Sequence, residues 1–444
     1  MKIYPDTKIY ILAPGNYSSG GPESLHQLCS QLLNCNVKAC MYYVPSIPKI
    51  FNPDNPVHEN FTKYHLPYVL EVEDDKRNII IIPESLVEYH YRTKKIRRVL
   101  WWLSVNIYIR TIRDLMNKRF LDPLSEPMPK FFYFYRKDEG IDHWTQSEYV
   151  RQFLELNGVK NSTDIETPMS HNFLSQAAHI DLSKKENIVA FNPKKDPEIA
   201  KRIITEASDI DWRRIENMTP EEVQTLLTKA KVYMDFGYFP GRERLPREAA
   251  LLGCVVITGK RGASGNDIDV NIPAEFKFDT DTLNPKQVVE KIRDVFENFS
   301  TAHESQKAFR DKEINAPKVF KSKVVEYFEI KELPLPSVAF VQGVSEESLL
   351  LAKGLLKNNF KPSFIIDDEM ALTESDKRIF REQGRNYLRL DNELIEIVTR
   401  DDAKFLYLEG RIKKFALLEP SDAELDAMKD FYGADVGDLL IFSL

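Results

Sequence analysis

The 444-residue sequence predicts an α/β protein with two Rossmann-like domains and a smaller α/β module at the C-terminus. Short apolar runs, typical of buried strands, alternate with segments of helical periodicity. Several of these runs end in turns rich in glycine, proline or serine that open a helix, as in the β-α-β units of parallel sheets. The length exceeds that of one typical domain. We expect domains at residues 1–175, 183–330 and 335–444.

Composition excludes several classes of protein. Hydrophobic residues make up 43% of the chain, which is ordinary for a globular protein. The net charge of −7 argues against a nucleic-acid-binding protein, which usually carries a basic domain. The sequence shows neither a signal-peptide pattern nor an apolar run long enough to span a bilayer. We therefore expect the protein in the cytoplasm, with the inner face of the membrane as the second expected location.

The first domain is expected to open with a strand at 8–13, a turn rich in glycine and serine, and a helix at 23–33. Gly20 and Gly21 in this turn would let a phosphate or sugar approach backbone N–H groups, although a plain tight turn is the alternative. Later elements are expected as strands at 39–44, 78–83, 98–109 and 142–147 and a helix at 148–156.

Two features of this domain allow more than one interpretation. The stretch 98–109 follows a basic flank and is rich in aromatic and β-branched residues, which fits a buried strand better than contact with anionic lipid. Peripheral membrane contact stays the second interpretation. His143 is a candidate acid, base or acceptor ligand, but a lone histidine is more often structural.

The second domain is expected to begin with a strand at 187–191, followed by a loop with Lys194 and Lys195. The lysine pair suits a diphosphate, and two solvated lysines are the alternative. Further elements are expected as helices at 197–207, from 219–220 onward, at 285–298 and at 305–328, and a strand at 211–216.

Residues 231–273 carry the most specific pattern. A strand at 232–236, a loop that breaks at glycine and proline, a helix that ends at 252 and a strand at 255–258 predict one β-α-β unit. In open α/β sheets, ligands bind beyond the carboxyl ends of the strands, which is where this loop lies. The loop therefore predicts a ligand site at a helix N-terminus.

The charges of this loop point to a nucleotide. Arg242 and Arg244 offer forked donors for phosphate, and Glu243 lies between them. Leu245 opens the helix, and Glu248 near its start could accept bonds from two ribose hydroxyls. The alternative is a solvated charged loop, because a charge cluster is only a probabilistic sign of a functional site.

The segment PREAALLGCVVITGKRGA resembles the donor-binding segment of GT-B glycosyltransferases, especially the retaining group that acts in bacterial surface-polysaccharide synthesis. Glu248 and Gly253 match the family's pattern of a glutamate, small residues and a glycine before Val-Ile. The family's other glutamate, eight positions earlier, is replaced by Pro240. The resemblance covers residues 1–330 as architecture, and 231–273 as a motif.

The resemblance implies two Rossmann-like domains facing a cleft and an enzyme that moves a sugar from a nucleotide-sugar donor to a glycan or lipid-linked glycan, without a metal. The implied catalytic residues are Arg242, Arg244, Glu243 and His143. The implied donor-binding residues are Gly20, Gly21, Lys194, Lys195, Asn217, Met218, Leu245, Glu248, Gly262, Ala263 and Ser264. The alternatives are a catalytically inactive GT-B-like scaffold or binding protein, and a sugar-nucleotide epimerase. A metal held by Asn266, Asp267 and Asp269 is a further reading, but three loop oxygens are unspecific.

The tail predicts a third, smaller α/β module. Residues 333–336 (LPLP) resemble a linker. Strands are expected at 338–341, 362–367, 404–408 and 415–418, with a helix at 345–356. We expect this module to have an accessory or assembly role.

Overall fold

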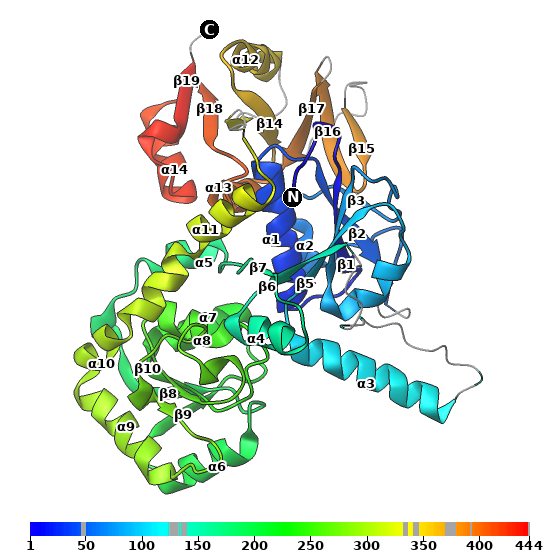
Figure 1. The fold of residues 1–444 in the computed structure, drawn as a ribbon. Helices are drawn as coiled ribbons and strands as arrows, with labels where there is room; N and C mark the ends of the chain where they lie inside the picture. The colour runs from blue at the N-terminus through cyan, green and yellow to red at the C-terminus, as the bar shows by residue number, and fades with distance from the viewer. Residues whose placement is uncertain are drawn as a thin grey trace. The chain divides into compact units, whose positions relative to one another are not determined.

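The computed structural model describes residues 1–45, 50–122, 124, 132, 134, 140–331, 336–340, 346–368, 379–390 and 393–442. The chain forms two compact units, one made of Met1–Val72 with Phe328–Leu444 and the other of Glu73–Tyr327. Figure 1 shows their elements. Most of the linker predicted at 333–336 lies outside the described residues. The predicted domain boundaries stay predictions.

The first unit opens with three parallel strands in the order β3-β2-β1. Their bounds are β1 (Ile9–Pro14), β2 (Ala39–Val44) and β3 (Tyr68–Val69). Helix α1 (Gly20–Asn34) joins β1 to β2 and buries Leu25, Leu28 and Leu32, whose spacing matches one helical face. The short helix α2 (Glu59–Thr62) follows β2.

The C-terminal module belongs to the same unit and has a sheet in the order β15-β16-β17-β14-β13-β18-β19. Its strands are β13 (Ser337–Phe340), β14 (Lys361–Ile366), β15 (Ile379–Glu382), β16 (Arg385–Leu390), β17 (Glu393–Val398), β18 (Lys414–Leu418) and β19 (Leu439–Phe442). Its helices are α12 (Glu346–Lys357), α13 (Arg400–Leu408), α14 (Asp422–Tyr432) and the 3-10 turn η5 (Val436–Asp438). Only the β16 pairings are antiparallel, so the module is doubly wound with an added hairpin.

The strand predicted at 404–408 is wrong, because these residues end helix α13. The hydroxyl of Thr399 accepts a hydrogen bond from the backbone N–H of Asp402 and caps the helix, and Ala403, Phe405 and Leu406 are buried. An N-cap threonine followed by acidic residues is a helix-start signal that outweighs the short β-prone run after it.

The module packs against the segment before β3 within the first unit. The rings of Tyr64 and Phe405 lie 4.8 Å apart, and Arg411 donates to the Tyr64 carbonyl at 3.0 Å. The Nδ1 atom of His65 lies 2.7 Å from a carboxylate oxygen of Glu396. The tail is therefore a packed part of the first unit.

The second unit begins with four parallel strands in the order β4-β5-β6-β7. Their bounds are β4 (Ile79–Pro83), β5 (Arg97–Trp102), β6 (Ile141–Thr145) and β7 (Thr163–Asp164). The helices are η1 (Glu84–Tyr91), α3 (Val105–Leu121), α4 (Glu148–Leu156) and α5 (His171–Ala177). The helix predicted at 148–156 is confirmed with the same bounds.

The prediction of one strand over 98–109 is wrong in its second half. Strand β5 ends at Trp102, and α3 begins at Val105 because the hydroxyl of Ser104 accepts from the backbone N–H of Ile107. A local cap thus overrides the strand preference of the isoleucines and tyrosine that follow.

A second parallel sheet in this unit has the order β12-β11-β10-β8-β9. Its strands are β8 (Glu186–Phe191), β9 (Asp211–Arg214), β10 (Ala230–Asp235), β11 (Val255–Gly259) and β12 (Lys277–Phe278). The helices are α6 (Pro197–Glu206), α7 (Pro220–Lys229), α8 (Arg244–Leu251), α9 (Pro285–Glu297), α10 (Phe299–Ser305) and α11 (Lys307–Tyr327), with the 3-10 turns η2 (Leu182–Lys184), η3 (Ala263–Gly265) and η4 (Ala274–Phe276). The predicted fold class, α/β with parallel Rossmann-like sheets and a further α/β module, is confirmed.

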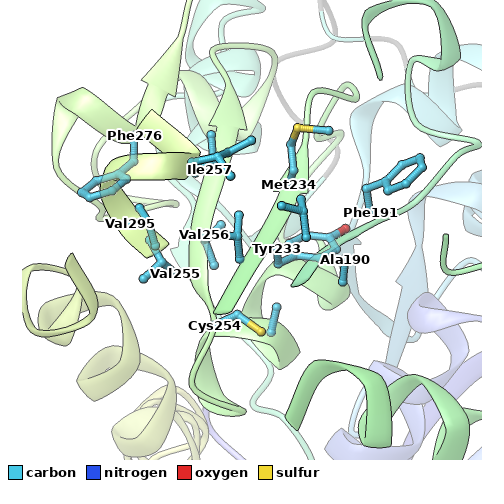
Figure 2. Close-up of a cluster of buried hydrophobic side chains, with 14 of the residues drawn as sticks. Ala190, Phe191, Tyr233, Met234, Cys254, Val255, Val256, Ile257, Phe276 and Val295 are labelled. Atoms are coloured by element: carbon cyan, nitrogen blue, oxygen red, sulfur yellow. The ribbon is translucent and has the colours of Figure 1, made fainter. Parts of the chain in front are cut away.

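The second sheet carries the core of this unit. Figure 2 shows Tyr233 and Met234 of β10 beside Val255, Val256 and Ile257 of β11, and these five side chains are at most 2% exposed. Near-continuous burial is expected of central parallel strands covered on both faces.

The helix predicted at 305–328 is α11, which the residue Gln306 separates from the preceding helix α10. Helix α10 ends at Ser305 and α11 begins at Lys307. The fully buried Gln306 side chain donates to the Val256 carbonyl and accepts from its N–H, both at 2.9 Å. This pair of bonds ties the break in the helix to the centre of the sheet.

Candidate functional site

The chain order of the second sheet reverses between β8 and β10. From β8 the chain first passes to β9 on one side and then to β10 on the other. In open α/β sheets of this order, ligands bind outside the carboxyl ends of the strands at this topological switch point. The loops that follow β8 and β10 therefore form the candidate site.

These two loops are in contact. The Nζ atom of Lys195, after β8, lies 3.1 Å from a carboxylate oxygen of Glu243, after β10. A Cβ atom on Gly237 would lie 2.6 Å from Cδ of Lys195, so the glycine lets the lysine cross the loop. The structure thus brings together Lys195, which the sequence predicts to bind the donor, and Glu243, which it predicts to be catalytic.

The loop after β11 lies against the same edge. Arg261 forms an ion pair with Asp196, the N-cap residue of α6. Gly262 has φ +64°, and a Cβ there would lie 2.1 Å from the Phe239 carbonyl oxygen, which also accepts from the N–H of Ala263. The position therefore requires glycine.

Two other predicted donor residues of this loop have internal roles. Ala263 and Ser264 are fully buried. The Ser264 hydroxyl donates to the Gly259 carbonyl at 2.5 Å and accepts from the N–H of Arg261 at 3.2 Å. Both residues shape the loop that carries Arg261, and their contact with a donor stays a prediction.

Helix α8 begins at the same edge. Glu243 is its N-cap residue and Arg244 its first residue. The Nε atom of Arg244 lies 3.0 Å from a carboxylate oxygen of Glu248, one turn later, and the arginine side chain is 45% exposed. Leu245 packs against the core of the sheet.

We name these half-exposed charges the switch-point cluster. It consists of Lys195, Asp196, Glu243, Arg244, Glu248 and Arg261. Its three cations and three carboxylates form three ion pairs around a helix N-terminus, and such an edge can exchange a carboxylate for phosphate.

Arg242 lies in a different environment. Its side chain is 1% exposed and forms ion pairs with Glu166 and with Glu313, the latter at 2.5 Å. The sequence predicts Arg242, like Arg244, as a donor for the diphosphate. The structure instead encloses its guanidinium between two carboxylates, where a ligand has no contact surface.

Arg247 completes this buried network. It donates to Glu313 at 2.7 Å and to the carbonyl of Thr167 at 3.0 Å. Burial alone would raise the pKa of Glu313, but Arg242 and Arg247 lower it to about 2. We call Arg242, Arg247, Glu166 and Glu313 the buried network.

Asp235 is a site residue that the sequence analysis missed. It ends β10 at the switch point, is 3% exposed, and accepts from the N–H of Gly237 at 2.8 Å and from the Tyr233 hydroxyl at 2.9 Å. Burial raises the pKa of Asp235 to about 6. An acidic residue at the carboxyl end of an apolar strand is the sequence signal that could have identified Asp235 as a site residue.

His143 is held inside the first sheet of this unit. Its ring is buried, and Nδ1 accepts a hydrogen bond from the Trp102 indole at 3.0 Å. Burial lowers the pKa of His143 to about 4, so the ring is neutral near pH 7. The partner explains its place in the fold, and its catalytic role stays a prediction.

The remaining predicted donor residues lie on exposed turns or at the start of a helix. Lys194 is exposed, and its N–H bonds to the Asn192 side chain at 3.0 Å. Asn217, with φ +54°, and Met218 follow β9. Gly20 and Gly21 open α1 in the first unit. Their contact with a donor stays a prediction.

The loop oxygens considered for a metal have protein partners. Asp267 pairs with Lys277 at 2.7 Å, and Asp269 accepts from the backbone N–H groups of Glu148 and Tyr149. Within the described ranges, no group of three or more His, Cys, Asp or Glu side chains is placed to hold a metal ion.

None of the described helices combines the length and apolarity needed to cross a bilayer.

A cavity of about 410 Å³ lies between α6 and the strands β8 and β9. Its apolar walls include Phe191 and Trp212, and Arg214 and Lys201 add positive charge. The size and the mostly apolar lining are typical of small-molecule sites.

No protein-family model and no curated protein matches the chain. Solved structures similar to it include HepE of Anabaena with UDP-glucose, at 10% identity over 72% of this chain and 98% of that chain, with a TM-score of 0.47. Sucrose-phosphate synthase from Thermosynechococcus elongatus is 12% identical over 72% of this chain and 97% of that chain, with a TM-score of 0.48. α,α-Trehalose 6-phosphate synthase from Burkholderia multivorans is 6% identical over 72% of this chain and 97% of that chain, with a TM-score of 0.42. These proteins are GT-B glycosyltransferases, the class that the sequence resembles.

Proposed function

We propose that the chain is a glycosyltransferase that moves a sugar from a nucleotide-sugar donor to a glycan or lipid-linked glycan acceptor, in surface-polysaccharide synthesis. The observation that carries the proposal is the position of the switch-point cluster. Cations, a helix N-terminus and the carboxylate of Glu248 meet where the strand order reverses, and ligands of such sheets bind in the crevice at that point.

In this proposal the donor diphosphate binds at Lys195 and Arg244. Both cations are partly exposed, at 27% and 45%, and Arg244 lies at the first turn of α8, where backbone N–H groups favour an anion. Glu248 follows one turn later, and we propose that its carboxylate accepts hydrogen bonds from the ribose hydroxyls. The nucleoside base is placed near the loop after β9, beside the cavity that Trp212 and Arg214 line.

The reaction breaks the bond between the anomeric carbon and the diphosphate, and its electron pair goes to the leaving diphosphate. The acceptor hydroxyl oxygen forms the new bond to the anomeric carbon, and its proton passes to the leaving diphosphate. Negative charge grows on the leaving group, so fixed cations stabilise the transition state more than the ground state. In this proposal Lys195 and Arg244 supply that charge, and no metal is required.

The experiment is isothermal titration of the full chain with nucleoside diphosphates and their sugar conjugates, beginning with UDP and UDP-glucose, with and without EDTA. Binding that survives EDTA, and that weakens in Glu248→Ala while the unfolding transition is unchanged, supports the proposal. A chain that binds no nucleotide, or a folded Glu248→Ala variant of unchanged affinity, contradicts it.

A further inference from the structure

Two ion pairs of the switch-point cluster join loops that follow different strands. Lys195 with Glu243 links the loop after β8 to the loop after β10. Arg261 with Asp196 links the loop after β11 to the start of α6. Because the sheet order is β11-β10-β8, the second pair reaches past the end of β10. These ion pairs therefore cross the proposed diphosphate site.

Both partners of the Arg261–Asp196 pair stand on fixed backbone. One carboxylate oxygen of Asp196 caps α6 by accepting from the N–H of Ile199 at 3.2 Å, while the other faces Arg261. The Arg261 N–H donates to Ser264, and its carbonyl accepts from the N–H of Phe239. The pair can therefore open by rotation of the Arg261 side chain, with both loops in place.

The pair is also accessible. The side chain of Arg261 is 36% exposed and that of Asp196 is 21% exposed. Partly exposed ion pairs are weak, and a guanidinium binds phosphate through two parallel hydrogen bonds. A diphosphate, with more charge than one carboxylate, is therefore a stronger partner for Arg261 than Asp196 is.

We propose that Arg261 is a further donor-binding residue, which Asp196 holds in the free chain and which turns to the donor diphosphate on binding. The inference rests on the proposed function, because it concerns the same site. Asp196 then acts as a competitor for the cation, and donor affinity reflects the exchange of one anion for another.

This exchange makes an unusual prediction, namely that removal of a charged site residue tightens binding. Asp196→Asn keeps the helix cap, since Asn and Asp cap equally well, but removes the competing charge. Diphosphate affinity should rise about two- to fivefold, the range that corresponds to a partly exposed ion pair. Arg261→Gln should weaken binding about tenfold or more, as expected for a lost charge-assisted hydrogen bond.

The experiment is titration of the full chain with pyrophosphate and with UDP, GDP, ADP and CDP at low ionic strength. The variants are Asp196→Asn, Arg261→Gln and their double variant, with Asp209→Asn as a matched control because Asp209 pairs with Arg293 on the surface. A thermal unfolding curve for each variant confirms the fold.

Tighter binding by Asp196→Asn that disappears in the double variant, with Asp209→Asn equal to the wild type, supports the exchange. Equal or weaker binding by folded Asp196→Asn, or wild-type affinity in Arg261→Gln, overturns it while the proposed function stands. A wild-type chain that binds none of the five probes contradicts the proposed function itself.

Discussion

Arg242 and Arg244 are two residues apart in the same loop, yet they belong to opposite kinds of ionic site. Arg242 is 1% exposed and sits between two carboxylates of the buried network. Arg244 is 45% exposed and forms an ion pair with the carboxylate of Glu248, one turn later on its own helix. The difference shows that an arginine motif does not tell which guanidinium meets the ligand. Burial decides this, and burial depends on elements far away in the chain.

The two sites should also differ in what they contribute. A buried pair is costly to break because it leaves a charge without solvent or partner, whereas a half-exposed pair adds little stability but can change partners. The buried network thus supports the loop, and the switch-point cluster is free to bind. The following predictions test this contrast.

The largest expected effect is on stability. Glu313→Gln removes the carboxylate shared by Arg242 and Arg247 and should lower the free energy of unfolding by about 3–5 kcal/mol, since it leaves buried charge uncompensated. Urea unfolding measures the change. Glu326→Gln, an exposed position on the same helix, is the matched control and should stay within about 0.5 kcal/mol of the wild type. Equal stability of the two variants would remove the contrast.

The next effect separates the two arginines by function. Arg244→Met should raise the dissociation constant for the nucleoside diphosphate about ten- to hundredfold, the value of a charge-assisted hydrogen bond, with little change in stability. Arg242→Met should lower the stability and leave the dissociation constant for the nucleoside diphosphate nearly unchanged. Titration and urea unfolding of both variants provide the comparison, and a folded Arg242→Met variant with selectively lost affinity would return Arg242 to the ligand site.

The smallest effect is a pH dependence of the buried network. The pKa of Glu313 is lowered to about 2, below the usual value of about 4.3 for an unfolded glutamate. Its contribution is therefore fully present above about pH 4.3 and is lost as the pH falls through 2. The difference in unfolding free energy between the wild type and Glu313→Gln should be constant from about pH 5 upward and shrink below about pH 4. A difference that already shrinks between pH 7 and 5 would contradict the paired carboxylate.

The parallel α/β architecture could be predicted from the sequence, because continuous apolar runs, helical periodicity and glycine turns are local signals. The sequence placed β2 and α4 with the bounds that the structure has. It was wrong where a capping residue reversed a local preference, as Ser104 does for α3 and Thr399 for α13.

Which charges of the central stretch share a site depends on the tertiary fold. Glu313 is 66 residues away from Arg247 and Asp196 is 65 residues away from Arg261, and no spacing in the sequence relates such partners. The strand order that brings the loops after β8, β10 and β11 to one edge is likewise a long-range property. The physical reason is that an ion pair depends on distance and desolvation in the folded chain, and the local sequence records neither.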